Sequence, residues 1–145
     1  MQFRLLSRAA LCLALIFGVA TAFADERATV ELTIKRMQDA VLAGDADAYL
    51  ALVAKDDENF LHEQENWAKD LKTHRPIAFT LAIAEPRDGQ ADTFGDSTAE
   101  FDLLISWTMA GLGEKGDNLT RTTRFPVQFA KSTAGQWLYR GERWL

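Results

Sequence analysis

Residues 57–84 read DENFLHEQENWAKDLKTHRPIAFTLAIA, and the spacing of apolar residues changes within this stretch. In its first part Phe60, Trp67 and Leu71 recur at helical intervals and form one stripe. After Pro76 apolar residues alternate with small or polar ones, which is the two-residue period of a strand. Proline also disfavours helical backbone in the residue that precedes it. The stretch therefore predicts an amphipathic helix that leads directly into a sheet and covers it.

The two-residue period continues to the C-terminus. The clearest strand is predicted over 100–109, and its core-facing residues are Phe101, Leu103, Ile105, Trp107 and Met109. Further strands are predicted over about 77–84, 119–131 and 136–144. Pro126 falls inside the third of these four strands in chain order. Because proline cannot donate a ladder hydrogen bond, we expect a bulge or a sheet edge there.

Helices are predicted ahead of these strands. The first covers about 26–43, and its apolar stripe consists of Val30, Ile34, Met37 and Val41. Gly44 then stands in the usual C-cap position, and Asp45 can cap a short helix over 46–53. The third helix is the one over 57–74, with acidic residues in its first turn that suit the helix dipole.

The first 24 residues have the layout of a secretory signal peptide. Arg4 and Arg8 precede an apolar run over 9–20, and residues 22–24 read AFA, an A-x-A cleavage pattern. The run is shorter than the ~20 residues that a membrane-spanning helix needs. We therefore expect cleavage after residue 24, an exported protein that is periplasmic or extracellular, and no membrane association after cleavage. A retained N-terminal anchor is the alternative.

Residues 25–145 have the length of one domain with one core. They contain no cysteine, because the single one is Cys12, so packing and not a disulfide framework must hold the fold. Loss of residues 1–24 would move the formal net charge from −5 to about −7. An acidic domain repels phosphate backbones and anionic lipids, so we expect no nucleic acid partner.

Helices followed by antiparallel strands predict an α+β fold: three N-terminal helices packed on a curved four-stranded antiparallel sheet. Long strands curl as they twist, so a helix laid across them closes a cone with one open end. This order, with AGDADAYL at 43–50 and GQWL at 135–138, resembles the NTF2-like (SnoaL-like, cystatin-like) superfamily. The third helix is also similar to small secreted bacterial modules of this type. The resemblance covers nearly all of residues 25–145 and implies a cone-shaped pocket, but its motifs mark no chemistry.

Asp70 and His74 are the candidate catalytic residues. They are four residues apart on the third helix, so the carboxylate could orient and charge the imidazole. In NTF2-like enzymes an Asp–His pair in the cone does acid/base work, so the resemblance implies a catalytic role if His74 lies inside the pocket. The alternative is a surface histidine that interacts with the helix C-terminus.

We expect no metal and no cofactor. Residues 62–66 read HEQEN, which departs from H-E-x-x-H at its fifth position and suits a solvated acidic helix face. Residues 25–145 contain two histidines and no cysteine, a poor supply for a zinc site with three or four ligands. Neither a G-x-S-x-G motif, a P-loop nor a G-x-G-x-x-G motif is present.

Aromatic residues are the stronger indication of a site. Those expected to face the interior are Phe60, Trp67, Phe79, Phe101, Trp107, Phe125 and Phe129. They either fill the core completely or leave a pocket for a small apolar ligand at the mouth of the cone. For the pocket, the predicted ligand-binding residues are Tyr49, Trp67, His74 and Trp107.

Arginines gather on the last two predicted strands: Arg121, Arg124, Arg140 and Arg143. Acidic partners across the sheet are Glu100, Asp102 and Glu142. The group is either a solvated ladder of ion pairs, each contributing ~0–1 kcal/mol, or a docking patch for a protein. The NTF2-like resemblance implies that the outer sheet face can form a homodimer.

The sequence thus predicts an exported, non-catalytic NTF2-like domain that acts as an accessory module and binds a small molecule or a protein. The alternative is a small lyase, isomerase or hydrolase that uses the Asp70–His74 pair in the cone pocket. A purely structural dimer is the third hypothesis.

Overall fold

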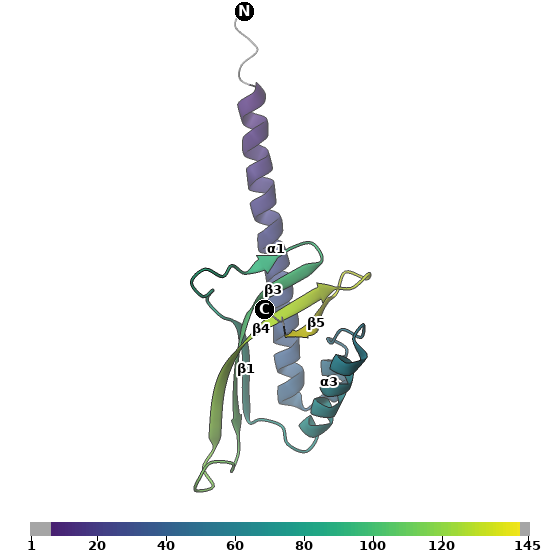
Figure 1. The fold of residues 1–145 in the computed structure, drawn as a ribbon, viewed down its shortest axis with the longest axis vertical. Coiled ribbons are helices and arrows are strands. Elements are labelled where there is room, and N and C mark those ends of the chain that lie inside the picture. Colours follow the sequence, from purple (N-terminus) through teal and green to yellow (C-terminus); the bar gives the residue numbers. More distant parts are fainter. Residues whose placement is uncertain (1–6, 143–145) are drawn as a thin grey trace, which may run out of the picture.

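The computed structural model describes the backbone of residues 7–142 and the side chains of residues 25–142. The helices are α1 (Ser7–Ala43), α2 (Ala46–Leu50) and α3 (Glu58–Leu71). The strands are β1 (Ala78–Ile83), β2 (Thr93–Phe94), β3 (Thr98–Met109), β4 (Leu119–Lys131) and β5 (Trp137–Glu142). The lower part of α1 and the whole of α3 lie against one side of the twisted sheet (Figure 1).

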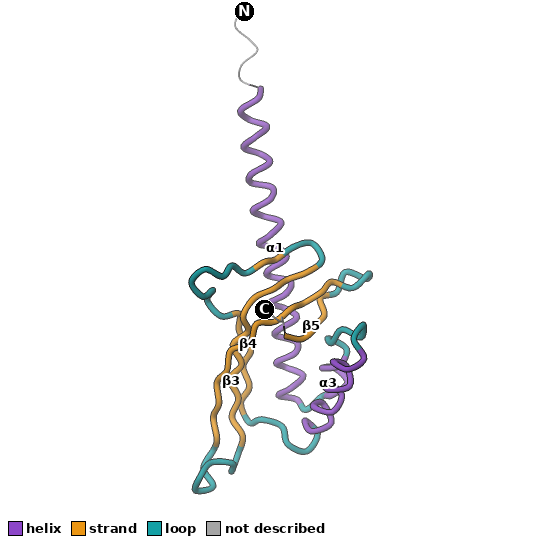
Figure 2. The backbone as a smooth tube through the Cα atoms, viewed as in Figure 1, coloured by secondary structure: helices purple, strands orange, loops and turns teal. Residues whose placement is uncertain are grey.

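All the strand pairs that are described are antiparallel, and the sheet has the order β1-β3-β4-β5 with β2 also paired to β3. The long β3–β4 hairpin forms the spine of the sheet (Figure 2). This arrangement confirms the predicted α+β fold with helices on a curved antiparallel sheet. The two-residue strand β2 is an addition, because it lies in a segment where no strand was predicted.

The register places the predicted apolar residues of β1, β3 and β4 on one face. Phe79 pairs with Trp107, and Leu103 pairs with Phe125. Successive side chains on a strand point to opposite faces, so the odd-numbered residues of these strands share the helix-covered side. Phe101, one of these odd-numbered residues, is fully buried there. The core is therefore closed between this sheet face and the helices.

Helix α1 buries its predicted stripe, and Val30 and Val41 have no exposed surface. It ends at Ala43, and Gly44 follows with a positive φ of 68°, as the C-cap prediction requires. Its helical backbone begins at Ser7 and not near residue 26. Signal-peptide cleavage therefore stays a prediction. In the part of the chain searched, no helix combines the length and apolarity needed to cross a membrane.

Helix α2 is shorter than predicted. Asp45 caps it as expected, with its side chain accepting from the backbone N–H of Ala48. The helix ends at Leu50 and not at Val53, because the segment that follows binds β5. The backbone N–H of Tyr139 donates to the carbonyl of Leu52 at 2.8 Å, and the N–H of Ala54 donates back to the carbonyl of Tyr139 at 2.8 Å. These long-range bonds end the helix early.

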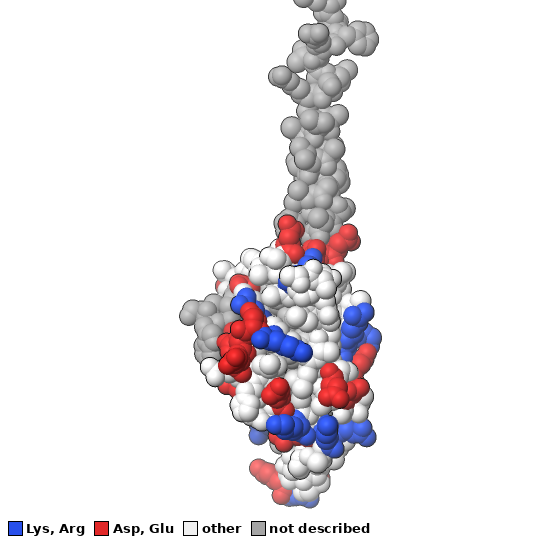
Figure 3. Space-filling model, turned by 90° about the vertical axis from the view of Figure 1, so that its right-hand side faces the viewer, with Lys and Arg blue, Asp and Glu red and all other residues white. Residues whose placement is uncertain are grey.

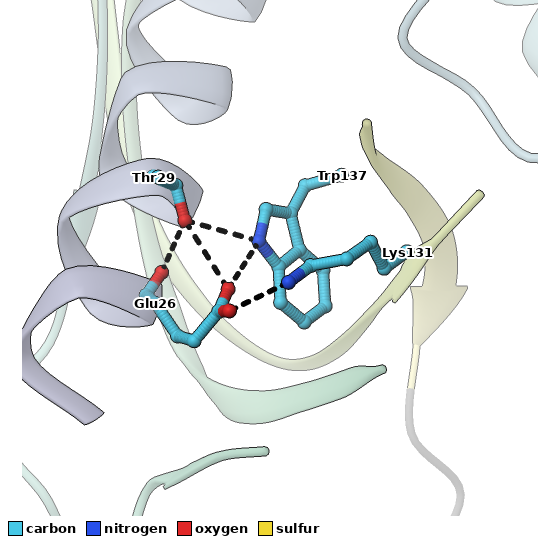
Figure 4. Close-up of polar contacts among 4 residues, drawn as sticks. All are labelled: Glu26, Thr29, Lys131 and Trp137. Atoms are coloured by element: carbon cyan, nitrogen blue, oxygen red, sulfur yellow. Dashed lines mark hydrogen bonds and ion pairs between the residues drawn. The ribbon is translucent and has the colours of Figure 1, made fainter. Parts of the chain in front are cut away.

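A polar cluster holds the start of the packed part of α1 against the C-terminal strands (Figure 4). Glu26 Oε1 lies 2.6 Å from Lys131 Nζ, and Trp137 Nε1 donates to Glu26 Oε2 and to Thr29 Oγ1, each at 3.1 Å. The Lys131 ammonium also lies 4.9 Å from the centre of the Trp137 ring. The cluster therefore ties residues more than one hundred positions apart in the sequence.

The predicted irregularity at Pro126 is found beside it. The β4–β5 register shifts between Val127 and Phe129, and the described part of β5 pairs with β4 only from Val127 onward. Pro126 therefore lies where the described part of β5 does not require its missing N–H. The last strand was predicted to extend to residue 144, and Arg143 and Trp144 lie outside the described residues.

The ion pairs on the outer sheet face differ from the predicted ladder. Asp102 pairs with Arg124 across the strands, at 2.6 Å, but it is buried and not solvated. Arg87, from the loop after β1, lies 3.0 Å from the same carboxylate oxygen. Arg140 pairs with Asp56 at 2.6 Å, a residue ahead of α3. Partner choice here depends on loops whose paths the strand pattern did not predict.

Candidate functional site

A cavity of about 390 Å³ lies between α3 and the inner face of the sheet. Its walls come from all three helices and from β1, β3, β4 and β5. The lining residues are Met37, Tyr49, Gln64, Trp67, Phe79, Leu81, Leu103, Ile105, Trp107, Thr123, Phe125, Tyr139 and Glu142. Its volume is within the range of small-molecule sites, and its walls are mainly aliphatic and aromatic.

The sheet side of the cavity follows from strand alternation. The paired residues Leu81 and Ile105 stand in the centre, and Ile105 is in turn opposite Thr123 on β4. Residues on a curved sheet face splay apart with distance from the core. The side chains near the far end of β3 are accordingly only partly buried, and Trp107 is one of them. The hollow is the unfilled end of the core.

Helix α3 supplies the opposite wall. Asp57 caps this helix by accepting from the N–H groups of Asn59 and Phe60, as predicted. Trp67 packs its ring 4.7 Å from that of Tyr49, at an interplanar angle of 54°. Trp67 is still 39% exposed, so its ring lies at the rim of the cavity and Tyr49 lies deeper.

The polar groups of the cavity are few. The Tyr49 hydroxyl donates to Gln64 Oε1 at 2.6 Å, and burial raises the pKa of Tyr49 far above its ordinary value. Burial, with a smaller contribution from the nearby Glu142 carboxylate, raises the pKa of Tyr139 to about 12. Both phenols are therefore neutral at pH 7 and offer hydrogen bonds without charge.

The structure places His74 and Asp70 outside the cavity lining, which contradicts the predicted acid/base pair in the cone. Helix α3 ends at Leu71, and its last turn tightens to three-residue bonds such as Thr73 N–H to the Asp70 carbonyl. His74 consequently leaves the apolar stripe. Its side chain is exposed, with Nδ1 2.9 Å from Thr73 Oγ1.

The other predicted ligand-binding residues, Tyr49, Trp67 and Trp107, all line the cavity. Their role in binding stays a prediction. Sequence reasoning assigned no role to Gln64, although it stands on the same helical stripe. It also missed Tyr139, because the bulge and the glycine in β5 obscured the alternation of that strand. A marker for Gln64 was available: a polar residue on an otherwise apolar stripe.

A second, larger hollow adjoins the cavity. This groove, of about 940 Å³, lies between the first half of α3 and β5. Its lining residues are Asp56, Asp57, Glu58, Asn59, Phe60, Glu63, Gln64, Gln128, Tyr139, Arg140, Gly141 and Glu142. Gln64, Tyr139 and Glu142 line both spaces, so the two meet along these three side chains.

No group of three or more His, Cys, Asp or Glu side chains is placed to hold a metal ion in the described part of the chain. The Tyr–Gln contact and the carboxylate of Glu142 are therefore the polar features on which the chemistry of this site is argued.

Comparisons with known proteins identify the fold. No family model matches the sequence, and no curated protein matches it. A scytalone dehydratase-like structure from Novosphingobium aromaticivorans has a TM-score of 0.62 and 12% identity, over 81% of this chain and 80% of that one. A conserved protein from Planctomyces limnophilus has a TM-score of 0.59 and 13% identity, over 80% and 91%. A protein from Kribbella flavida has a TM-score of 0.57 and 13% identity, over 83% and 89%.

The chain therefore has the NTF2-like fold that the sequence resemblance implied. One of the similar structures is described by a dehydratase activity and another only as a conserved protein. At these identities the likeness establishes the fold alone, and the function must be argued from the cavity.

Proposed function

We propose that the chain is an exported, non-catalytic binding domain whose cavity holds a small, largely apolar ligand. The observation that carries the proposal is the hollow of about 390 Å³ between α3 and the sheet, with aromatic walls and few polar groups. Such a site binds mainly through apolar contact and uses single hydrogen bonds to orient the ligand. Trp67 and Trp107 supply ring surfaces, and Gln64 and Thr123 supply uncharged polar groups.

The protonation states of the cavity support binding more than turnover. A general base works best when its pKa lies near the working pH. Tyr49 and Tyr139 have pKa values raised well above that range, chiefly by burial, so at neutral pH they act as hydrogen-bonding phenols. The proposal accordingly replaces the predicted enzyme alternative, since His74 and Asp70 do not reach the cavity.

The neutral dye N-phenyl-1-naphthylamine tests this proposal, because its emission rises when it leaves water for an apolar site. The unmodified chain is expected to bind it saturably. Ile105→Trp places an indole inside the cavity and is expected to weaken binding by about tenfold or more, since the displaced dye loses its apolar contacts. The dye is excited directly, so the added tryptophan does not contribute to the signal.

Leu112→Trp is the matched control. Leu112 is 60% exposed in the loop between β3 and β4 and does not line the cavity. This variant adds the same indole and should bind the dye like the unmodified chain. Equal binding by Ile105→Trp and Leu112→Trp, with both variants folded by circular dichroism, would show that the dye binds elsewhere and would refute the proposal.

We also propose that the outer sheet face joins two copies of the chain. The centre of this face is made of short uncharged side chains around the partly exposed Leu104; they are Ala78, Thr80, Ala82, Ser106, Thr108, Thr120 and Thr122. A flat face without charge is suited to packing against its own copy. Sedimentation equilibrium should show a dimer that Leu104→Arg dissociates. A monomer at every concentration contradicts this proposal.

A further inference from the structure

The place where the apolar cavity meets the neighbouring groove defines the chemistry of one end of a bound ligand. Gln64, Tyr139 and Glu142 line both spaces. Among the side chains that line the cavity, Glu142 carries the only carboxylate, and no lysine or arginine lines it. A ligand that fills the apolar hollow therefore presents its other end to Glu142 and to the groove.

The groove beyond this point is acidic. Two of its five carboxylates have structural roles: Asp57 caps α3, and Asp56 pairs with Arg140, the only basic residue of the lining. Glu58, Glu63 and Glu142 form no ion pair with any side chain of residues 25–142. Like charges in a concave, partly desolvated site raise the local concentration of cations and repel anions.

The charge preference belongs to this lining and not to the whole face. The side of the molecule that carries α3 and β5 has both acidic and basic side chains on it (Figure 3). Lys69 and Lys72 near the end of α3, for example, do not line the groove. Aromatic rings beside the junction, those of Tyr139 and Phe60, are in edge-to-face contact 5.4 Å apart and can also stabilise a cation.

We propose that the ligand is a cationic amphiphile: an apolar ring or short chain in the cavity, with a protonated amine beside Glu142. This inference rests on the proposed binding function and adds the chemical class of the ligand. Glu142 is its specificity-determining residue, and Glu63 adds to the field from α3.

Three naphthalene compounds of similar shape test the proposal: 1-naphthylmethylamine, 1-naphthalenemethanol and 1-naphthoate. Each displaces N-phenyl-1-naphthylamine in a competition titration at pH 7 and low salt. The amine should bind about tenfold more tightly than the alcohol, and the carboxylate should bind most weakly. Raising the salt concentration should reduce the advantage of the amine and leave the alcohol unchanged.

Glu142→Gln should remove most of the advantage of the amine without changing the affinity of the alcohol. Glu114→Gln is the control, because it makes the same change of charge in the β3–β4 loop, outside the lining of both spaces. It should leave the order of the three compounds unchanged.

The outcomes separate the two proposals. If the amine and the alcohol bind equally to the unmodified chain, the cationic class is wrong while the binding function stands. If the advantage of the amine survives Glu142→Gln, the assigned position of the charge is wrong. If neither these compounds nor the dye binds, the proposed function itself fails.

Discussion

The hydroxyl of Tyr49 donates a 2.6 Å hydrogen bond to Oε1 of Gln64 and so joins α2 to α3 at the wall of the cavity. Tyr49 is almost fully buried, and its ring also packs against Trp67. A bond between two short helical segments fixes how α3 lies across the sheet. The shape of the cavity therefore depends on this contact.

Removal of that hydroxyl should destabilise the fold. Tyr49→Phe is expected to lower the free energy of unfolding by about 1–2 kcal/mol, because it also leaves the Gln64 carbonyl without its donor. Urea denaturation measures the change. Tyr139→Phe is the control: no hydrogen bond of the Tyr139 hydroxyl is found among the described residues, so the expected change is below ~0.5 kcal/mol. Equal losses in the two variants would contradict the assigned role of Tyr49.

Glu26 should make stability depend on pH in the acid range. The hydrogen bond from Lys131 is the main cause that lowers the pKa of Glu26 below its ordinary value of 4.5. The unfolded chain then binds a proton more readily than the folded one, so the stabilisation is complete above pH 4.5 and is lost as the pH falls through the lower, folded pKa. Glu26→Gln should cost about 1 kcal/mol at pH 7, a figure reduced for the partial exposure of the pair.

Denaturation of both forms at several pH values tests this. The difference between the unmodified chain and Glu26→Gln should stay constant above pH 4.5 and shrink below it. Asp39→Asn, which removes the exposed Lys35–Asp39 pair on the same helix, should change the free energy by less than ~0.5 kcal/mol at neutral pH. A Glu26 effect that does not diminish in acid would refute the charge-based explanation.

Local signals in the sequence predicted the parts of the fold that depend on neighbouring residues. Asp45 and Asp57 cap helices as expected, and β4 has the predicted bounds, because capping and alternation need only a few adjacent positions. The early end of α2 could not be predicted in this way. It depends on Tyr139, which lies more than eighty residues further along the chain.

The candidate site shows the same division. Trp67 and Trp107 were placed correctly because the helical stripe and the strand period both direct them inward. His74 was misplaced because a tighter last turn rotates it off the stripe, and a difference of three residues in a helix end is beyond pattern reasoning. Asp102 was assigned to solvent because alternation gives the face of a side chain but not the loop that covers it.

Gly141 should tolerate a side chain less well than Gly135. Both have positive φ, of 103° and 81°, so alanine is strained at either position. At Gly135 an added Cβ meets nothing within 4 Å, whereas at Gly141 it would lie 3.0 Å from Phe60 Cε2. Gly135→Ala is expected to cost about 1 kcal/mol and Gly141→Ala about 1–2 kcal/mol more. Equal midpoints in urea would contradict the close packing of Phe60 on β5.

Two neighbouring carboxylates should respond oppositely to neutralisation. Asp102 is buried and bound by Arg124 and Arg87, so Asp102→Asn should cost about 2 kcal/mol, less than for a fully buried pair because both arginines are partly exposed. Asp92 has a buried oxygen, Oδ2, with no hydrogen-bond partner in the described chain, and burial is the main cause that raises its pKa.

For Asp92 the pH argument runs the other way. A carboxyl whose pKa is higher in the folded chain destabilises the fold above its unfolded pKa, and this loss is relieved as the pH falls. Asp92→Asn should therefore raise the free energy of unfolding by about 0.5–1 kcal/mol at pH 7. Denaturation at pH 7 of the two variants decides the matter, and a loss of stability in Asp92→Asn would contradict the assignment.

His74 and Trp67 lie two helical turns apart, and their substitutions separate a surface role from a binding role. His74→Ala should change the free energy of unfolding by less than ~0.5 kcal/mol and leave the affinity for N-phenyl-1-naphthylamine unchanged, because the imidazole is exposed and outside the cavity lining. Trp67→Ala opens the rim and should weaken dye binding by about tenfold, since a large aromatic contact is lost. If His74→Ala weakened binding as much as Trp67→Ala, the mouth of the cavity would have to extend past the end of α3, and the assignment of the site to the hollow between α3 and the sheet would be wrong.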